Sequence, residues 1–107
     1  MGQAPLRVIL IDDAWADLNE LSEYWIARGE AWRAEKYSRD LIRVAEEELS
    51  DRVRAGRGRR LKSRRHPDAR EILAFGIYRV IYEIDEAAST VKVLRFWHSH
   101  RDTPPLD

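Results

Sequence analysis

The spacing of apolar positions changes along the chain, beginning with a strand pattern and then a helix pattern. Residues 6–11 are rich in Val, Ile and Leu, which predicts a short buried strand. After Asp12 and Asp13 the apolar residues recur at helical spacing as far as Gly29, and a glycine there predicts the end of the helix. Either aspartate is expected to cap this helix, because a carboxylate accepts the free backbone N–H groups at a helix start.

A second helical stripe follows almost at once and consists of Tyr37, Leu41, Val44, Ala45 and Leu49. Two helices joined by so short a link lie antiparallel, so the pattern predicts a helical hairpin. Trp32 is expected to pack within this hairpin, because aromatic residues at helical spacing usually do.

The remaining chain has the spacing of loops and strands. Residues 54–65 contain glycine and many arginines without apolar periodicity, which predicts a frayed helix end followed by a loop. Polar turns then separate three strand-like runs, residues 71–75, 78–84 and 91–97. This order predicts an α+β fold, in which an N-terminal strand and an antiparallel two-helix hairpin precede a three-stranded antiparallel sheet packed on the helices.

Length and composition limit the class of protein. A chain of 107 residues suits one domain, expected to span residues 1–107. The absence of cysteine excludes disulfides and Cys-containing zinc sites, and three histidines without metal-ligand spacing predict neither a metal nor a cofactor. The apolar runs are too short for a signal-peptide core or a membrane span, so we expect a cytoplasmic protein without membrane contact.

A formal net charge of zero hides a strong separation of charge. Residues 12–50 contain eleven acidic and five basic side chains, whereas residues 51–70 contain nine basic and two acidic ones. Such a basic segment suits an acidic or polyanionic partner. The alternative is a solvated loop that keeps the protein soluble.

Two segments resemble the RelE/ParE superfamily of bacterial toxins. Residues 70–84, REILAFGIYRVIYEI, are similar to its central strands, and residues 93–102, VLRFWHSHRD, to its closing strand and terminal motif. That motif runs leucine-arginine, a hydrophobic pair, histidine, a small residue, a basic residue, arginine and aspartate. Ser99 and His100 stand where relatives commonly carry glycine and arginine. The element order agrees with the superfamily over residues 6–102.

The resemblance implies the toxin of a type II toxin–antitoxin system. The terminal motif looks closer to the ParE branch, which implies inhibition of DNA gyrase by binding. The alternative is a RelE-like endoribonuclease that cleaves mRNA at the ribosome. Both branches imply a cognate antitoxin, with an acidic and partly disordered tail that folds on binding, and a hetero-oligomer of the two proteins.

Strand alternation sorts the predicted sheet into two faces. Tyr78, Val80, Tyr82 and Ile84 share one face, and on the last strand Lys92, Leu94, Phe96 and His98 separate from Val93, Arg95 and Trp97. If the more apolar set faces the helices, Arg79 and Arg95 emerge together on an open, concave face. The alternative is that they pair with Glu71 and Glu83 across the sheet.

Guanidinium groups bind phosphate oxygens in pairs, so the expected target-binding residues are Arg64, Arg65, Arg79, Arg95, His98 and Arg101. If the protein is instead a nuclease, its candidate catalytic residues are Arg79, Glu83, Arg95, His98, His100 and Arg101. The expected antitoxin contacts are Trp15, Trp25, Arg59 and Arg60. Core packing is the alternative for each tryptophan.

Overall fold

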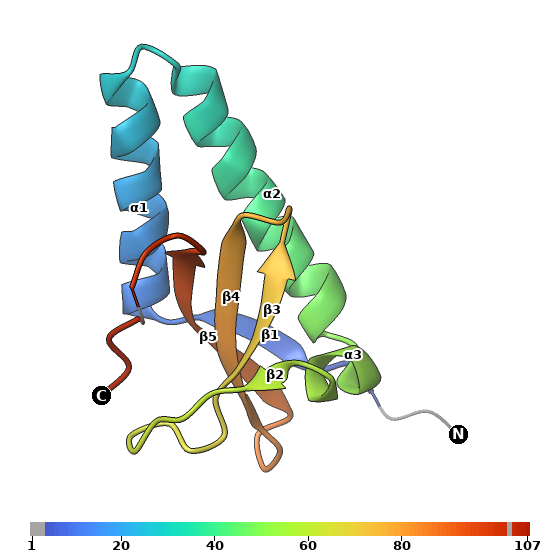
Figure 1. Ribbon diagram of the computed structural model, residues 1–107. Helices are drawn as coiled ribbons and strands as arrows, with labels where there is room; N and C mark the ends of the chain where they lie inside the picture. The colour runs from blue at the N-terminus through green and yellow to red at the C-terminus, as the bar shows by residue number, and fades with distance from the viewer. Residues whose placement is uncertain (1–3, 103) are drawn as a thin grey trace.

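The computed structural model describes residues 4–102 and 104–107 as an α+β fold (Figure 1). The helical hairpin stands against one face of a sheet, as predicted (Figure 1). The elements in chain order are β1 (Arg7–Leu10), α1 (Asp12–Ala27), α2 (Ala31–Leu49), α3 (Arg52–Gly56), β2 (Arg59–Arg60), β3 (Arg70–Ala74), β4 (Tyr78–Asp85) and β5 (Thr90–His98).

The sheet has five strands in the order β1-β5-β4-β3-β2. It therefore contains the predicted N-terminal strand and the short strand β2 in addition to the three strands that were predicted to form it. Strand β1 joins it parallel to β5, whereas the other pairs are antiparallel. The segment predicted as a loop adds the two-residue strand β2 and the helix α3. The Asp51 carboxylate starts that helix by accepting the backbone N–H groups of Val53 and Arg54.

The ends of the hairpin helices differ in part from the sequence prediction. Gly29 follows α1 with a φ of 74°, which a residue without a side chain adopts without strain. The predicted aspartate cap was wrong, because Ile11 is the N-cap and Asp12 and Asp13 lie in the first turn. Trp32 is 60% exposed and so does not pack within the hairpin. It falls outside the buried stripe of α2. In the part of the chain described, no helix is long and apolar enough to cross a membrane.

Two hydrophobic cores lie on opposite faces of the sheet. The larger one fills the space between the sheet and the helices, and its members include Tyr82, Leu41, Leu49, Val80 and Phe96. The smaller one contains Ala69, Ile81, Leu94 and Trp97, with Ile11, Leu61 and Leu106 packed against it. The face predicted to be open is therefore covered by the β2–β3 loop and by residues 104–107.

A bulge changes the predicted faces of β5. Ile81 lies opposite Arg95, but the next residue, Tyr82, lies opposite Val93, so Leu94 is an extra residue in β5. The predicted face of β4 was correct. On β5 the prediction was wrong, because Val93 packs on the helix side with Phe96, while Leu94 packs on the other side.

Candidate functional site

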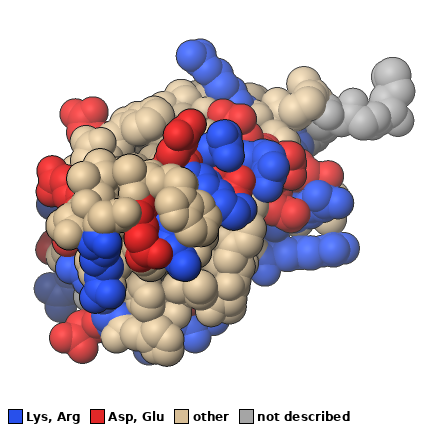
Figure 2. Space-filling model, turned by 90° about the horizontal axis from the view of Figure 1, so that it is seen from above, with Lys and Arg blue, Asp and Glu red and all other residues tan. Residues whose placement is uncertain are grey.

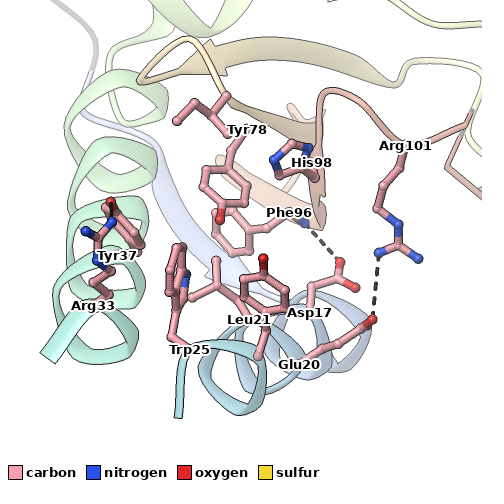
Figure 3. Close-up of a pocket in the computed structure, with 12 residues that line it drawn as sticks. Asp17, Glu20, Leu21, Trp25, Arg33, Tyr37, Tyr78, Phe96, His98 and Arg101 are labelled. Atoms are coloured by element: carbon pink, nitrogen blue, oxygen red, sulfur yellow. Dashed lines mark hydrogen bonds and ion pairs between the residues drawn. The ribbon is translucent and has the colours of Figure 1, made fainter. Parts of the chain in front are cut away.

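A groove of about 720 Å³ separates the helical hairpin from the adjoining end of the sheet (Figure 3). Helix α1 forms one wall, α2 contributes the far end, and the ends of β4 and β5 form the floor. The lining residues are Asp17, Glu20, Leu21, Tyr24, Trp25, Arg33, Tyr37, Ile77, Tyr78, Phe96, His98 and Arg101.

Aromatic rings dominate the end of the groove between the two helices. The Trp25 ring centroid lies 5.0 Å from that of Tyr24 and 5.6 Å from that of Tyr37. The Arg33 guanidinium lies 5.0 Å from the Trp25 ring centroid and 4.8 Å from that of Trp32. Within the described chain the buried Trp25 Nε1 has no hydrogen-bond acceptor. This end therefore offers apolar surface and the Trp25 Nε1 donor.

Tyr78 and His98 line the groove on the side of the sheet, and His100 lies beside His98. The rings of Tyr78 and His98 meet edge to face at 5.6 Å, and the rings of His98 and His100 lie 5.2 Å apart. The His100 backbone N–H donates to Nδ1 of His98 over 3.1 Å. Neutral His98 therefore carries its proton on Nε2. Burial raises the pKa of the Tyr78 hydroxyl, which keeps this phenol protonated at neutral pH.

Arg95 is held by Asp17 of α1. Its Nε and Nη2 donate to the two carboxylate oxygens over 2.7 and 2.8 Å, and the Phe96 backbone N–H donates to Oδ2 over 3.0 Å. Strand β1 pairs with β5 only as far as Val93. Beyond that point the Asp17 carboxylate accepts the backbone N–H of β5 at Phe96. The hydrogen bonds that Arg95 donates to Asp17 raise the pKa of the Arg95 guanidinium. Arg95 thus joins α1 to β5.

The other charged residues predicted on the sheet are also paired. Arg79 Nε donates to Glu71 over 2.5 Å, which agrees with the alternative that the sheet arginines pair with glutamates across the sheet. Arg59 lies 3.0 Å from the same carboxylate. Glu83 pairs with His66 at 3.1 Å and not with an arginine. These pairs lie on the face of the second core.

The remaining predicted residues lie in loops, on α1 and on the short strand β2. The Arg64 and Arg65 side chains are exposed in the β2–β3 loop. The Arg101 guanidinium lies 4.0 Å from the Trp97 ring centroid and 3.9 Å from Glu20. Arg60 pairs with Asp68 at 3.4 Å, beside Arg59 on β2. Trp15 is half exposed on α1.

The predicted catalytic residues are divided between the two faces of the sheet. His98 lies in the groove beside Tyr78, whereas Arg79 is opposite Trp97 and Glu83 is opposite Lys92, away from the helices. The predicted concave face with converging arginines was wrong, because the second core occupies it. The described residues contain no group of three or more side chains placed to hold a metal ion.

Sequence reasoning missed most of the groove. It assigned functions to Trp25, His98 and Arg101, but not to Tyr24 or Tyr37. Several aromatic residues clustered near the link between two helices were the available signal.

On the face that is seen when the view of Figure 1 is turned to look from above, acidic and basic side chains lie side by side around uncharged ones (Figure 2). This face therefore has no continuous basic field, despite the separation of charge along the sequence.

Comparison with known proteins identifies the family. The sequence model of one protein family, described as "ParE toxin of type II toxin-antitoxin system, parDE", matches residues 8–103. The match covers nearly the whole chain. The chain belongs to the ParE toxin family. No curated protein sequence matches it.

Two solved toxin–antitoxin complexes share the ParE-family fold of this chain. One is RelBE2 from Mycobacterium tuberculosis, with a TM-score of 0.67, 21% identity, and coverage of 94% of this chain and 98% of that one. The other is the chromosomal ParDE system from P. aeruginosa, with a TM-score of 0.69, 18% identity, and coverage of 87% and 95%. The fold and family expected from the sequence are therefore confirmed.

Proposed function

We propose that this ParE-family toxin of a type II toxin–antitoxin system inhibits DNA gyrase by binding and is neutralised by a cognate antitoxin. The observation that carries the choice of ParE is the family match over residues 8–103. Gyrase inhibition follows from the ParE branch, to which the terminal motif also looks closer.

The separation of the candidate catalytic groups favours a binding function. A general acid or base needs to lie within hydrogen-bond reach of the proton that it transfers. Arg79 and Glu83 lie on the face of the sheet opposite the groove that holds His98, and Arg79 is already bound to Glu71. One RNA phosphate in the groove would not meet all of these groups.

The accessible side chains favour target contacts in the β2–β3 loop and at the end of β5. Asp17 and Glu71 hold the two sheet arginines, Arg95 and Arg79. We therefore assign direct target contact to Arg64, Arg65, His98 and Arg101, and a positioning role to the two sheet arginines. Exposed guanidinium groups suit an acidic protein surface or nucleic-acid phosphate.

The antitoxin is proposed to use the groove and then to continue around the chain. The aromatic end of the groove suits the apolar face of a partner helix, and Trp25 lies there. Arg59 and Arg60 lie on β2, at the opposite edge of the sheet from β1. An acidic segment that contacts both places must wrap the toxin, as a segment that folds on binding does.

One observation favours the alternative, a RelE-like endoribonuclease. Tyr78, His98 and Arg101 line the same groove, with His98 free to donate from Nε2. A histidine and an arginine together supply a proton donor and a cation for phosphoryl transfer. The nuclease hypothesis therefore makes His98 essential.

Activity assays on the purified toxin distinguish the two targets. We expect inhibition of gyrase supercoiling and no cleavage of ribosome-bound mRNA. His98→Ala should weaken inhibition by less than about tenfold, whereas loss of a general acid or base lowers cleavage by about a hundredfold or more. His66→Ala, outside the groove, is the matched control. Cleavage of mRNA in the ribosomal A site that depends on His98 would overturn the proposal.

Antitoxin binding tests the groove separately. Tyr24 lines the groove, whereas Ile26, on the same helix and similarly exposed, does not. We expect Tyr24→Ala to weaken antitoxin binding by about tenfold, as loss of an aromatic anchor does, and Ile26→Ala to leave it unchanged. Calorimetry with the cognate antitoxin measures both. Equal losses in the two variants would place the antitoxin elsewhere on α1.

A further inference from the structure

The β2–β3 loop surrounds a carboxylate with hydrogen-bond donors. The Ser63 hydroxyl, the Arg64 N–H and the Arg65 N–H all donate to Oδ1 of Asp107, over 2.5, 2.9 and 3.1 Å. Ser63 Oγ also accepts the His66 N–H over 3.0 Å, which fixes the hydroxyl in the loop. Successive backbone N–H groups directed at one point form an anion-binding nest.

Basic side chains near this nest have no ion-pair partner among the described residues. The donors from Ser63 and the loop backbone lower the pKa of Asp107, so its carboxylate is ionised at neutral pH. The Lys62 and Arg64 side chains line the same hollow as Asp107, and Arg65 is exposed next in sequence. Within residues 4–102 and 104–107 no carboxylate lies within 4.0 Å of a charged nitrogen of these three side chains. Among the described residues these three basic side chains are therefore not held in ion pairs and can contact an anion.

The nest opens into a hollow with room for a larger anion. Its volume is about 510 Å³, and Leu61, Lys62, Ser63, Arg64, Pro67 and Asp107 line it. Asp107 binds through one carboxylate oxygen only, since all three donors bond to Oδ1. A tetrahedral phosphate places one oxygen on those donors and directs the others toward the basic side chains, which suits its higher charge.

We propose that residues 63–66 form a phosphate-binding site in which the Asp107 carboxylate is a built-in competitor. The ligand is a phosphate group, either as a monoester or within a nucleic-acid backbone. Phosphate displaces Asp107 without unfolding the segment, because Pro104 is buried and Leu106 packs on the second core, while Asp107 is exposed. This proposal rests on the loop geometry and not on gyrase as the target.

Amide chemical shifts of the full chain test the site directly. Inorganic phosphate is titrated at constant ionic strength while the Arg64 and Arg65 amide signals are followed by NMR. We expect a saturable shift in Asp107→Ala with a dissociation constant about tenfold lower than in the unsubstituted protein, because an occupied site reduces apparent affinity. Glu35→Gln makes the same change of charge on α2, away from the loop, and should behave like the unsubstituted protein.

Three further measurements make the test decisive. Asp107→Asn removes the charge but retains one acceptor, so its affinity should lie between those of the other two proteins. Ser63→Ala added to Asp107→Ala should weaken phosphate binding again. Dimethyl phosphate, a diester, is titrated in parallel, and binding of both ligands would indicate that a nucleic-acid backbone fits. Absence of a saturable shift in folded Asp107→Ala, or an equal gain of affinity in Glu35→Gln, would overturn the proposal.

Discussion

The arginines of the sheet and the arginines of the β2–β3 loop carry the same group in opposite surroundings. The Arg95 and Arg79 side chains are only 15% and 18% exposed, and each meets a carboxylate of similarly low exposure. Arg64 and Arg65 are exposed and donate from their backbones to Asp107. A covered charge needs a fixed partner, because desolvation is costly. An exposed charge remains available to a ligand.

The difference in exposure indicates a structural role for the sheet arginines and a binding role for the loop arginines. Asp17 joins α1 to β5 through Arg95, and Glu71 joins β2, β3 and β4 through Arg59 and Arg79. Substitutions at the two carboxylates should therefore lower stability, whereas substitutions in the loop should lower binding.

Asp17→Ala should cause the largest loss of unfolding free energy. It leaves the Arg95 guanidinium without its partner and the Phe96 N–H without an acceptor. Removing one partner of a buried pair costs about 3–5 kcal/mol of unfolding free energy, which urea denaturation measures. The control is Glu20→Ala on the same helix, where the exposed contact with Arg101 is 3.9 Å long and about 1 kcal/mol or less is expected. Similar losses in both variants would contradict a structural role for Arg95.

Glu71→Gln should cause an intermediate loss of unfolding free energy. The amide keeps the shape of the side chain but removes the charge that Arg79 and Arg59 share. Hydrogen bonds to charged groups contribute about 1.5–3 kcal/mol each, so we expect a loss of about 2 kcal/mol in urea denaturation. Glu86→Gln breaks an exposed ion pair with Arg52 and serves as the matched control, with a loss below about 1 kcal/mol. An unchanged denaturation midpoint in Glu71→Gln would refute the role of this cluster.

Arg64→Ala combined with Arg65→Ala should leave stability nearly unchanged. Both side chains are exposed, so the unfolding free energy should change by about 0.5 kcal/mol or less. Gyrase inhibition should fall by about tenfold or more, because the proposed contacts with the target are lost. Arg39→Ala combined with Arg43→Ala removes the same charge from α2 and should leave inhibition intact. If both double variants lose inhibition equally, net charge and not the loop governs binding.

The helices and β4 were predictable because their patterns are local. Leu41, Ala45 and Leu49 recur at the spacing that buries one face of a helix. Val80, Ile81 and Tyr82 alternate between the two cores as a strand requires. The segments 70–84 and 93–102 likewise indicated the superfamily, and the family match confirms it.

The groove and the partners of the arginines were not predictable in the same way. The pattern of β5 was misread because a bulge adds Leu94 and shifts the strand by one residue. Asp17 follows Asp12 and Asp13 in an acidic helix, and nothing in that pattern distinguishes the one carboxylate that binds Arg95. The two residues are 78 positions apart in the sequence.

The sequence by itself determined the elements, the fold class and the family, because helical and strand periodicity depend on neighbours a few residues apart. Only the tertiary structure decided which cations are bound and which are available. Pairing of Arg95 with Asp17, and of the β2–β3 loop with Asp107, depends on segments brought together by sheet order and core packing. Distance in space, which residue spacing along the chain does not encode, controls those electrostatic contacts.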